Sequence, residues 1–126
     1  MIQDRSIVKI ADNSGGLIGR VFKVIGGSRK RYAGIGEEVI ISIQTAQPRK
    51  AVKKKEVHRA VVVRTTNALR RKDGSYVRFD ENAVVLVVGS GKEPKEPKAN
   101  RVFGPIPREV VEAGYLKVGS LAPEIV

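Results

Sequence analysis

Two short stretches, "AVVV" at 60–63 and "AVVLVV" at 83–88, constrain the fold most strongly, because neither alternates apolar with polar residues. A strand with one face in water alternates at every second residue. A continuous β-branched run therefore indicates a strand that is covered on both faces or curled into a barrel. Similar runs recur along the chain, and we predict strands over residues 6–11, 19–25, 37–46, 57–66, 76–79 and 83–88.

Turn-forming residues separate these runs. "DNSGG" at 12–16 and "GIG" at 34–36 contain Asp, Asn and Gly, which tolerate left-handed backbone. "KDGS" at 72–75 predicts a hairpin, since Asp-Gly suits a primed turn. Short strands with regular turns predict an all-β fold, a small closed β-barrel without exposed edges. With 126 residues and no internal repeat, we expect one domain over residues 1–126.

The last quarter of the chain, residues 89–126, has a different character. "GSGKEPKEPKAN" at 89–100 is polar and holds two prolines, which exclude a central strand, so we predict an exposed loop there. "GPIPREVVEAG" at 104–114 predicts a short helix, with Pro107 in its first turn and Gly114 at its end. The ending "SLAPEIV" is apolar, and we expect it to pack back on the body of the protein.

The net charge of +11 is concentrated in one part of the chain. Residues 20–72 hold fifteen Lys and Arg against three acids, whereas the other residues hold nine against ten. A region of one sign is the electrostatic footprint of a polyanion binder. Nucleic acid is the favoured polyanion, and an anionic membrane surface or an acidic protein are the alternatives. No apolar run approaches the roughly 20 residues of a membrane span and the start does not resemble a signal peptide, so we expect a soluble protein.

Three basic clusters fall in predicted loops or at strand ends, where binding residues commonly lie on a rigid scaffold. Arg can grip a phosphate with two parallel hydrogen bonds, while Lys acts as a point charge. The first cluster lies between glycine turns, the second leads into the "AVVV" strand, and the third is at the predicted hairpin turn. In that order, the candidate binding residues are Arg29, Lys30, Arg31 and Tyr32; Arg49, Lys50, Lys53, Lys54, Lys55 and Arg59; and Arg70, Arg71 and Lys72.

The few aromatic residues help to separate the kinds of nucleic-acid binding. Proteins that bind single strands without sequence preference stack successive bases on aromatic side chains. Phe22 and Phe79 lie in apolar runs and are expected in the core, although alternation in "RVFKVI" at 20–25 is imperfect. Tyr32 is the one aromatic residue inside a basic loop. The composition therefore favours recognition of the backbone and shape of folded RNA, although DNA phosphates would attract the same charges.

Nothing in the sequence supports catalysis or a metal site. His58 is the only histidine and there is no cysteine, so the usual nitrogen and sulfur ligands of a metal cannot be assembled. We expect His58 to be structural or to face solvent. "GSGK" at 89–92 lacks the spacing of a phosphate-binding loop. We predict that the protein is not an enzyme and holds no cofactor.

Several motifs, in order and at matching spacing, resemble one family over the whole chain. That family is the bacterial type of the fourteenth protein of the large ribosomal subunit. The motifs are "MIQ", "ADNSG" (11–15), "GGSRKRYAGIGE" (26–37), "VVVRT" (61–65), "KDGSYVRFDENA" (72–83), "RVFGP" (101–105) and "SLAPEIV" (120–126).

The resemblance implies a five-stranded β-barrel with a β-ribbon and small C-terminal helices. It implies direct binding to large-subunit rRNA, intersubunit bridges to small-subunit rRNA, and a position beside the nineteenth large-subunit protein. It also implies docking of the ribosomal silencing factor on Asn100, Arg101 and Lys117, the positions that match the family's docking motif. The expected location is the cytoplasm, in the ribosome, or an organellar ribosome.

The sequence departs from the family's pattern at a few places. Ala99-Asn100-Arg101 stands where Gly-Thr-Arg is usual, and the loop before it is longer. "PRK" at 48–50 replaces "PRG", "SGGL" at 14–17 replaces "SGAR", and "REVVEAG" is more apolar than the usual helix. The alternative function is that of a free-standing RNA- or polyanion-binding barrel with a regulatory role.

Overall fold

Five strands close into a β-barrel in the computed structural model, which describes residues 2–26, 30–88 and 96–126. The strands follow one another around the barrel in the order β9-β2-β3-β5-β6, and β6 pairs back onto β9. The pair β2–β9 is parallel and the other pairs are antiparallel. Their bounds are β2 Ile7–Ile10, β3 Gly16–Val24, β5 Glu38–Ala46, β6 Val57–Arg64 and β9 Ala83–Val88. The predicted closed five-stranded barrel is confirmed.

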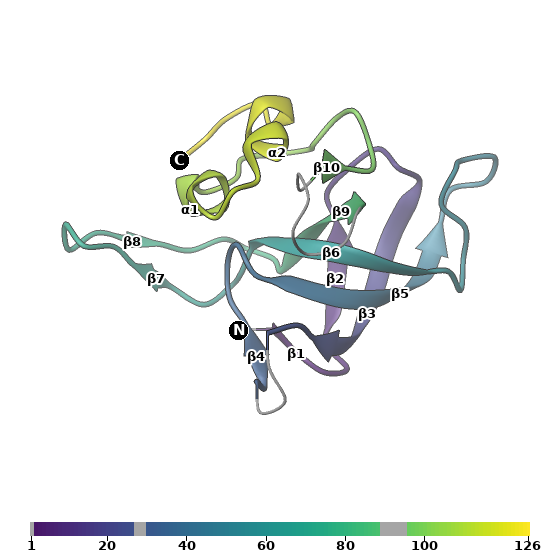
Figure 1. Ribbon diagram of the computed structural model, residues 1–126, viewed down its shortest axis with the longest axis horizontal. Helices are drawn as coiled ribbons and strands as arrows, with labels where there is room; N and C mark the ends of the chain where they lie inside the picture. Colours follow the sequence, from purple (N-terminus) through teal and green to yellow (C-terminus); the bar gives the residue numbers. More distant parts are fainter. Residues whose placement is uncertain (1, 27–29, 89–95) are drawn as a thin grey trace.

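Shorter strands and helices lie around the barrel (Figure 1). β1 (Ile2–Gln3) pairs with β4 (Tyr32–Ala33), and β7 (Leu69–Arg70) pairs with β8 (Tyr76–Val77) in a hairpin that reaches away from the barrel. β10 (Glu96–Pro97) adds to the end of β9. Two short helices, α1 (Arg108–Glu112) and α2 (Leu116–Leu121), lie over the side formed by β6 and β9.

The two uninterrupted apolar runs are buried on both faces, as predicted, except for the exposed Val88 at the end of β9. Ala60 and Val62 of β6 belong to the cluster inside the barrel, together with Val84 and Leu86 of β9. Their neighbours along the strands point outward into a second cluster. That second cluster includes Val61, Val63, Val85, Val87, Ile106, Val110, Tyr115 and Val118. The C-terminal segment therefore covers one outer side of the barrel, and the strands beneath it need no polar face.

The chain after the barrel follows the prediction in part. α1 begins at Arg108, so Pro107 is its N-cap residue and not a first-turn residue, while Gly114, with φ of 107°, follows the helix end. The helix α2 was not predicted from the residues. The ending does pack back: Ile106 donates its N–H to the Glu124 carbonyl at 3.0 Å and accepts from the Val126 N–H at 2.9 Å.

Three local predictions need correction. The strand predicted over residues 76–79 is only Tyr76–Val77. Residues 89–95 of the predicted loop, with "GSGK", lie outside the described residues, but Glu96–Pro97 is a strand, which proline tolerates because β10 is at an edge. The strand predicted from residue 19 begins at Gly16, where a Cβ would stand 2.7 Å from the Ile10 Cδ1, so a larger residue would displace the end of the Ile10 side chain.

The prediction that Phe22 fills the core is wrong, because this side chain is 46% exposed. The pairing of β3 with β5 passes from Val21↔Ile41 to Lys23↔Ile40, so Phe22 is an extra residue in β3 and marks a β-bulge. Both Phe22 and Lys23 face solvent as a result, while Val21 and Val24 point inside. Phe79, the other predicted core aromatic, is half-buried.

Candidate nucleic-acid interface

The second predicted cluster lies mainly on the connection between β5 and β6, residues 47–56, which we name the ledge. Its ends and middle are tied to the barrel. Gln47 donates its backbone N–H to the Gly15 carbonyl at 2.7 Å, and Lys55 donates to the Ile43 carbonyl at 2.8 Å. Val52 is completely buried in the inner core cluster. The ledge is therefore a positioned surface and not a loose loop.

Two further features shape the ledge. Gly15 has φ of 114°, and a Cβ at this position would stand 2.3 Å from the Cβ of Lys50, so the ledge passes where only glycine leaves room. The Glu56 carboxylate accepts the backbone N–H of Lys53, which lowers the pKa of Glu56. The same carboxylate lies 3.5 Å from the Nε2 of half-buried His58. The Glu56 carboxylate therefore helps to hold the backbone of the ledge in place.

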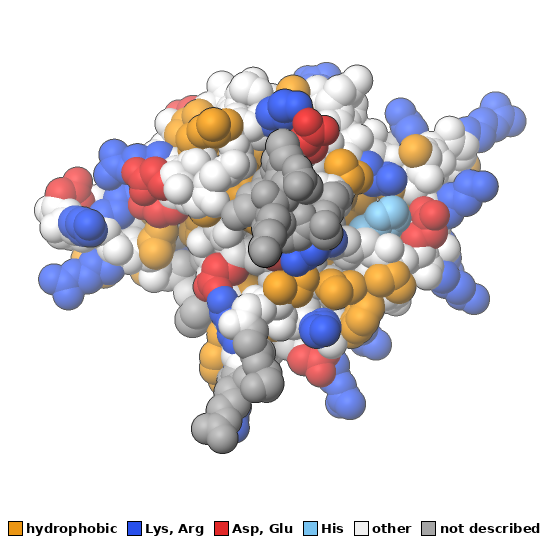
Figure 2. Space-filling model, in the orientation of Figure 1, with side chains coloured by type: hydrophobic (Ala, Val, Ile, Leu, Met, Phe, Trp, Pro, Cys, Tyr) orange, Lys and Arg blue, Asp and Glu red, His pale blue; other side chains and the backbone are white. Residues whose placement is uncertain are grey.

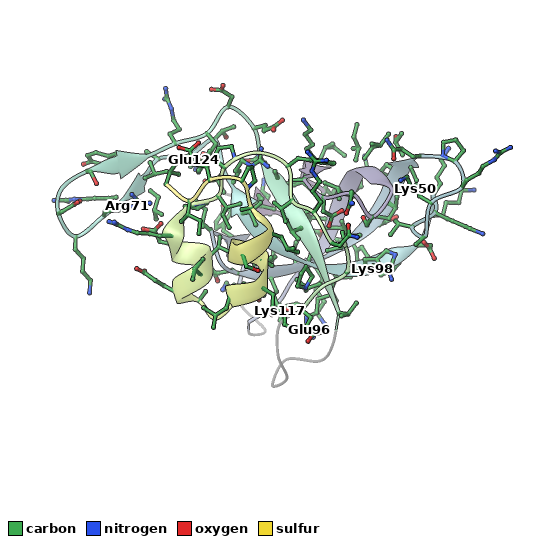
Figure 3. The ribbon with its side chains drawn as sticks, turned by 90° about the horizontal axis from the view of Figure 1, so that it is seen from above. Lys50, Arg71, Glu96, Lys98, Lys117 and Glu124 are labelled. Carbon is green, nitrogen blue, oxygen red and sulfur yellow. The ribbon has the colours of Figure 1, made fainter. Side chains whose placement is uncertain are left out.

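The ledge presents five exposed cations to solvent. Among the described residues, no carboxylate lies within ion-pair distance of any of them. Figure 2 shows Lys and Arg side chains projecting from the right-hand end of the molecule, where the ledge lies in Figure 1, and Figure 3 places Lys50 there. The five are Arg49, Lys50, Lys53, Lys54 and Lys55.

Arg59, the sixth member of that predicted cluster, is separate from the ledge. It lies within β6, and its guanidinium pairs with Glu38 of β5, whose other carboxylate oxygen accepts the Tyr115 hydroxyl at 2.5 Å. Burial and the neighbouring Glu38 raise the pKa of Tyr115. Arg59 therefore links the barrel to the C-terminal segment, and its charge is balanced within the protein.

The members of the first predicted cluster differ in whether they pair with a carboxylate of the protein or face solvent. Arg29 lies outside the described residues. Lys30 forms an ion pair with Glu37, whereas Arg31 and Tyr32 are exposed on the β1–β4 ribbon. Among the described members of this cluster, Arg31 and Tyr32 are thus the ones that face solvent.

The third cluster, on the β7–β8 hairpin, is also divided. Arg70 and Lys72 are exposed, but Arg71 points to the C-terminal segment. Its Nε and Nη2 donate to the two Glu109 carboxylate oxygens at 2.8 and 2.9 Å, and Nη2 donates to the Val126 carbonyl at 2.7 Å. This hydrogen-bonded pair lowers the pKa of Glu109. Arg71 fastens the turn of the hairpin to α1.

Two buried charged residues were not singled out from the sequence. Arg64 donates to Glu81 at 3.1 Å and to the Phe103 carbonyl, and burial lowers its pKa. The buried Asp12 accepts from the Leu86 N–H at 3.0 Å and from Ser14, while its burial raises its pKa. The available signal was a charged residue directly after an apolar run, since Arg64 follows "AVVV" and Asp12 follows the strand predicted over residues 6–11. Both residues join the barrel wall to connecting loops.

The three positions expected to dock the silencing factor lie on two elements: Asn100 and Arg101 on the segment that follows β10, and Lys117 on α2. Asn100 accepts from the Asn13 side-chain amide at 2.7 Å, and Arg101 lies over the Phe103 ring at 5.4 Å. Lys117 of α2 forms an ion pair with Glu96 of β10 at 2.5 Å, and Figure 3 shows the two side chains together. All three residues are exposed.

A groove of about 630 Å³ runs along β2 and β3, and we name it the aliphatic groove because Ile7, Val8, Ile10, Leu17 and Ile18 line it, together with polar residues such as Lys9, Lys50 and Glu81. A pair of adjacent exposed residues, Leu17 and Ile18, lies at further register shifts in β3. Ile7 and Phe103 also line the groove and are exposed. These exposed apolar side chains fit a protein neighbour better than RNA, while Lys50, which also lines the groove, belongs to the ledge.

The cationic groups do not form one continuous patch. The ledge and the β7–β8 hairpin lie at opposite ends of the molecule, as Lys50 and Arg71 show in Figure 3. The β1–β4 ribbon lies between them along the lower side in Figure 1. Within the described ranges, no group of acidic or histidine side chains is placed to hold a metal ion. In the same ranges, no helix has the length and apolar character to cross a membrane. The arrangement suits contacts with an extended polyanion on several sides.

The chain was compared with models of known protein families. A family model described as "Ribosomal protein L14p/L23e" matches residues 1–126. The match covers the barrel, the ledge, the hairpin and the C-terminal helices alike.

Proposed function

The chain belongs to the ribosomal protein L14p/L23e family, and from this premise we propose that its ledge binds large-subunit rRNA directly. Membership makes the chain a structural component of the large ribosomal subunit, a ribonucleoprotein that acts in translation. The family is structural and not enzymatic. The observation that carries the proposal is the set of five exposed ledge cations without an acidic partner among the described residues, held on an anchored connection.

The contacts within the protein refine the list of candidate rRNA-binding residues. We assign phosphate contacts to the ledge cations, to Arg31 and to the exposed Arg70 and Lys72, because their charges are free to meet phosphate oxygens. Lys30, Arg59 and Arg71 already pair with carboxylates of the chain. We assign these three to stabilising the protein surface on which the other cations stand.

Purified protein and purified RNA test direct binding. We expect the chain to bind large-subunit rRNA, extracted from ribosomes, more tightly than poly(U) at equal salt, since folded RNA presents a shaped phosphate surface. Equal affinity for the two RNAs would favour the alternative of a free-standing polyanion-binding barrel. Sedimentation gives the cellular counterpart: the protein should move with the large subunit before and after the subunits are dissociated.

The separation of the cationic ends supports a second contact, an intersubunit bridge. We infer that one end meets large-subunit rRNA while another cationic surface reaches small-subunit rRNA. Photo-crosslinkers at Lys54 on the ledge and at Lys72 on the hairpin can test this in whole ribosomes. One of the two should give small-subunit crosslinks that vanish when the subunits are separated, and their absence from both positions would contradict the inference.

Protein contacts are assigned to the remaining surfaces. We infer that the ribosomal silencing factor docks on Asn100, Arg101 and Lys117, which are exposed on adjoining elements. Lys117→Glu should reduce recovery of the factor in a pull-down, while Lys54→Glu, an equal charge change on the ledge, should leave it unchanged. Equal recovery with wild type and Lys117→Glu would remove Lys117 from the docking site.

The aliphatic groove is assigned to the nineteenth large-subunit protein. Its exposed Ile7, Ile18 and Phe103 suit packing against apolar side chains of a neighbour. Ile18→Asp should weaken binding of the purified nineteenth protein, because a carboxylate would be buried without a partner. Unchanged binding would place that neighbour on another surface.

A further inference from the structure

We propose that Phe22, with Lys23 and Arg31 beside it, forms a stacking site for one unpaired nucleotide of rRNA. The inference rests on the proposed rRNA binding and adds a specific element to it. The sequence favoured recognition of the backbone and shape of folded RNA, partly because Phe22 was expected in the core. Its exposure supplies the aromatic face that this expectation lacked.

The β-bulge in β3 creates the site. Without the extra residue, Phe22 and Lys23 would point to opposite faces of the strand. With it, both side chains lie on the outer face, and their backbone is held by pairing with β5 on either side. The aromatic ring and the cation are therefore presented together by a rigid barrel strand, where bulges often redirect functional side chains.

The surroundings of Phe22 suit a nucleotide. A surface pocket of about 450 Å³ is lined by Gln3, Phe22, Lys23 and Arg31, with Asp4, Val24 and Lys30 completing it. Gln3 can donate to and accept from a base edge. Lys23 and Arg31 are exposed and can reach the phosphates on either side of the base.

A second aromatic residue stands close to this pocket. Tyr32 pairs directly with Gln3 across the β1–β4 ribbon, so their side chains lie on the same face of that ribbon. Tyr32 is exposed, like Phe22. The adjoining aromatic surface extends the area on which an unpaired base or its ribose can rest.

The combination favours RNA over a protein neighbour. Both surfaces have an aromatic ring, cations and amides, but five aliphatic side chains line the groove on β2 and β3, whereas Val24 is the one aliphatic residue among the described residues that line this pocket. Bases inside a duplex are stacked on one another and cannot use the ring. The ligand is therefore a nucleotide from a loop, bulge or single-stranded junction of the large-subunit rRNA.

Binding to large-subunit rRNA extracted from ribosomes tests the site with matched variants. Phe22→Leu keeps an apolar side chain but removes the π face, and we expect about a tenfold loss of affinity, within the range measured for stacked aromatics. Phe22→Tyr should keep wild-type affinity. Phe103→Leu is the control, since Phe103 is 45% exposed but lies in the aliphatic groove. Melting temperatures should be the same for all four proteins.

Ultraviolet crosslinking of the complex gives a direct readout. A base stacked on Phe22 should yield a nucleotide adduct on that residue, identified by mass spectrometry, and the adduct should be absent from Phe22→Leu. Unchanged affinity of Phe22→Leu together with no adduct would overturn the stacking site. If wild type still binds rRNA in that case, the proposed function stands and only this inference fails. If wild type does not bind rRNA, the proposed function fails first.

Discussion

The ledge and the β7–β8 hairpin are both cationic turns at opposite ends of one barrel, but they use their charges differently. The ledge holds its backbone in place with main-chain hydrogen bonds, with Glu56 and with the buried Val52. Its cations are left to solvent. The hairpin is held partly by a cation, because Arg71 spans to Glu109 and to the Val126 carbonyl.

The difference shows that a cation in a basic cluster has a role set by distant residues. Arg71 lies between Arg70 and Lys72, and the three are alike in sequence. Of the three, only Arg71 meets a carboxylate of the described residues, that of Glu109 in a helix 38 positions later in the chain. Charge counting therefore locates a polyanion-binding region, while the fold decides which of its cations are available to bind.

The largest effect on rRNA affinity is expected from a variant that removes unpaired cations from the ledge. Lys53, Lys54 and Lys55, changed together to Ala, should lower affinity for large-subunit rRNA about a hundredfold at about 0.15 M salt, if each cation releases roughly 0.9 counterion as on duplex nucleic acid. The dependence of log affinity on log salt should become shallower by two to three, by the same estimate of about 0.9 per contact. Titrations at several salt concentrations measure both quantities.

The melting temperature is the control for the ledge variant. All three side chains are exposed and the ledge is anchored by its backbone, so the triple variant should melt with wild type. An unchanged salt dependence would mean that these lysines do not contact phosphates. The ledge and the hairpin would then not differ in how their cations contribute to RNA binding.

The next effect concerns Arg64, a cation used entirely for structure. Arg64→Met should lower the free energy of unfolding by about 2–3 kcal/mol, because the Phe103 carbonyl loses a charged donor and the space against Gly104 is refilled imperfectly. Urea denaturation measures the change. Arg78→Met, at an exposed arginine, is the control and should be close to wild type. Equal stability of the two variants would show that the buried ion pair contributes nothing net.

Adjacent arginines on the hairpin give a smaller and sharper test. Arg71→Met should lower the melting temperature by a few degrees, because Glu109 loses its two hydrogen bonds. Arg70→Met should leave stability unchanged and slightly weaken rRNA binding, since Arg70 is exposed. Thermal denaturation and rRNA titration of both variants measure the contrast. The reverse pattern would assign Arg71 to RNA and Arg70 to the fold.

The barrel could be predicted because its strands carry strong local patterns. β9 was predicted at its observed bounds, Ala83–Val88, and β5 and β6 nearly so. The absence of alternation in these runs correctly indicated burial on both faces. The helix α2 could not be recognised, because "LKVGSL" is short, contains glycine and is stabilised by packing Val118 into the outer cluster.

The candidate site was harder to predict. Whether a cation is available to bind RNA depends on its contacts with residues that are remote in the sequence. Arg59 and Lys30 have carboxylate partners on neighbouring strands, which charge counting along the sequence does not reveal. The prediction that Phe22 lies in the core was wrong for a different reason. Val21 and Val24 both point inward three positions apart, a spacing that requires a bulge, and the imperfect alternation of "RVFKVI" was the only trace of it.

The smallest expected effect is a pH dependence confined to the hairpin. Glu109 has an ordinary pKa of 4.5, lowered in the folded protein by Arg71, so the folded state keeps its carboxylate charged to lower pH than the unfolded state does. The stabilisation from this pair is therefore complete above pH about 4.5 and disappears as pH falls through the lowered pKa. The melting-temperature difference between wild type and Arg71→Met should shrink on acidification from pH 7 to below that range. The difference between wild type and Arg70→Met should stay near zero throughout. A wild-type advantage over Arg71→Met that persists at the acid end would show that Arg71 acts through packing and the Val126 carbonyl, and not through the Glu109 charge.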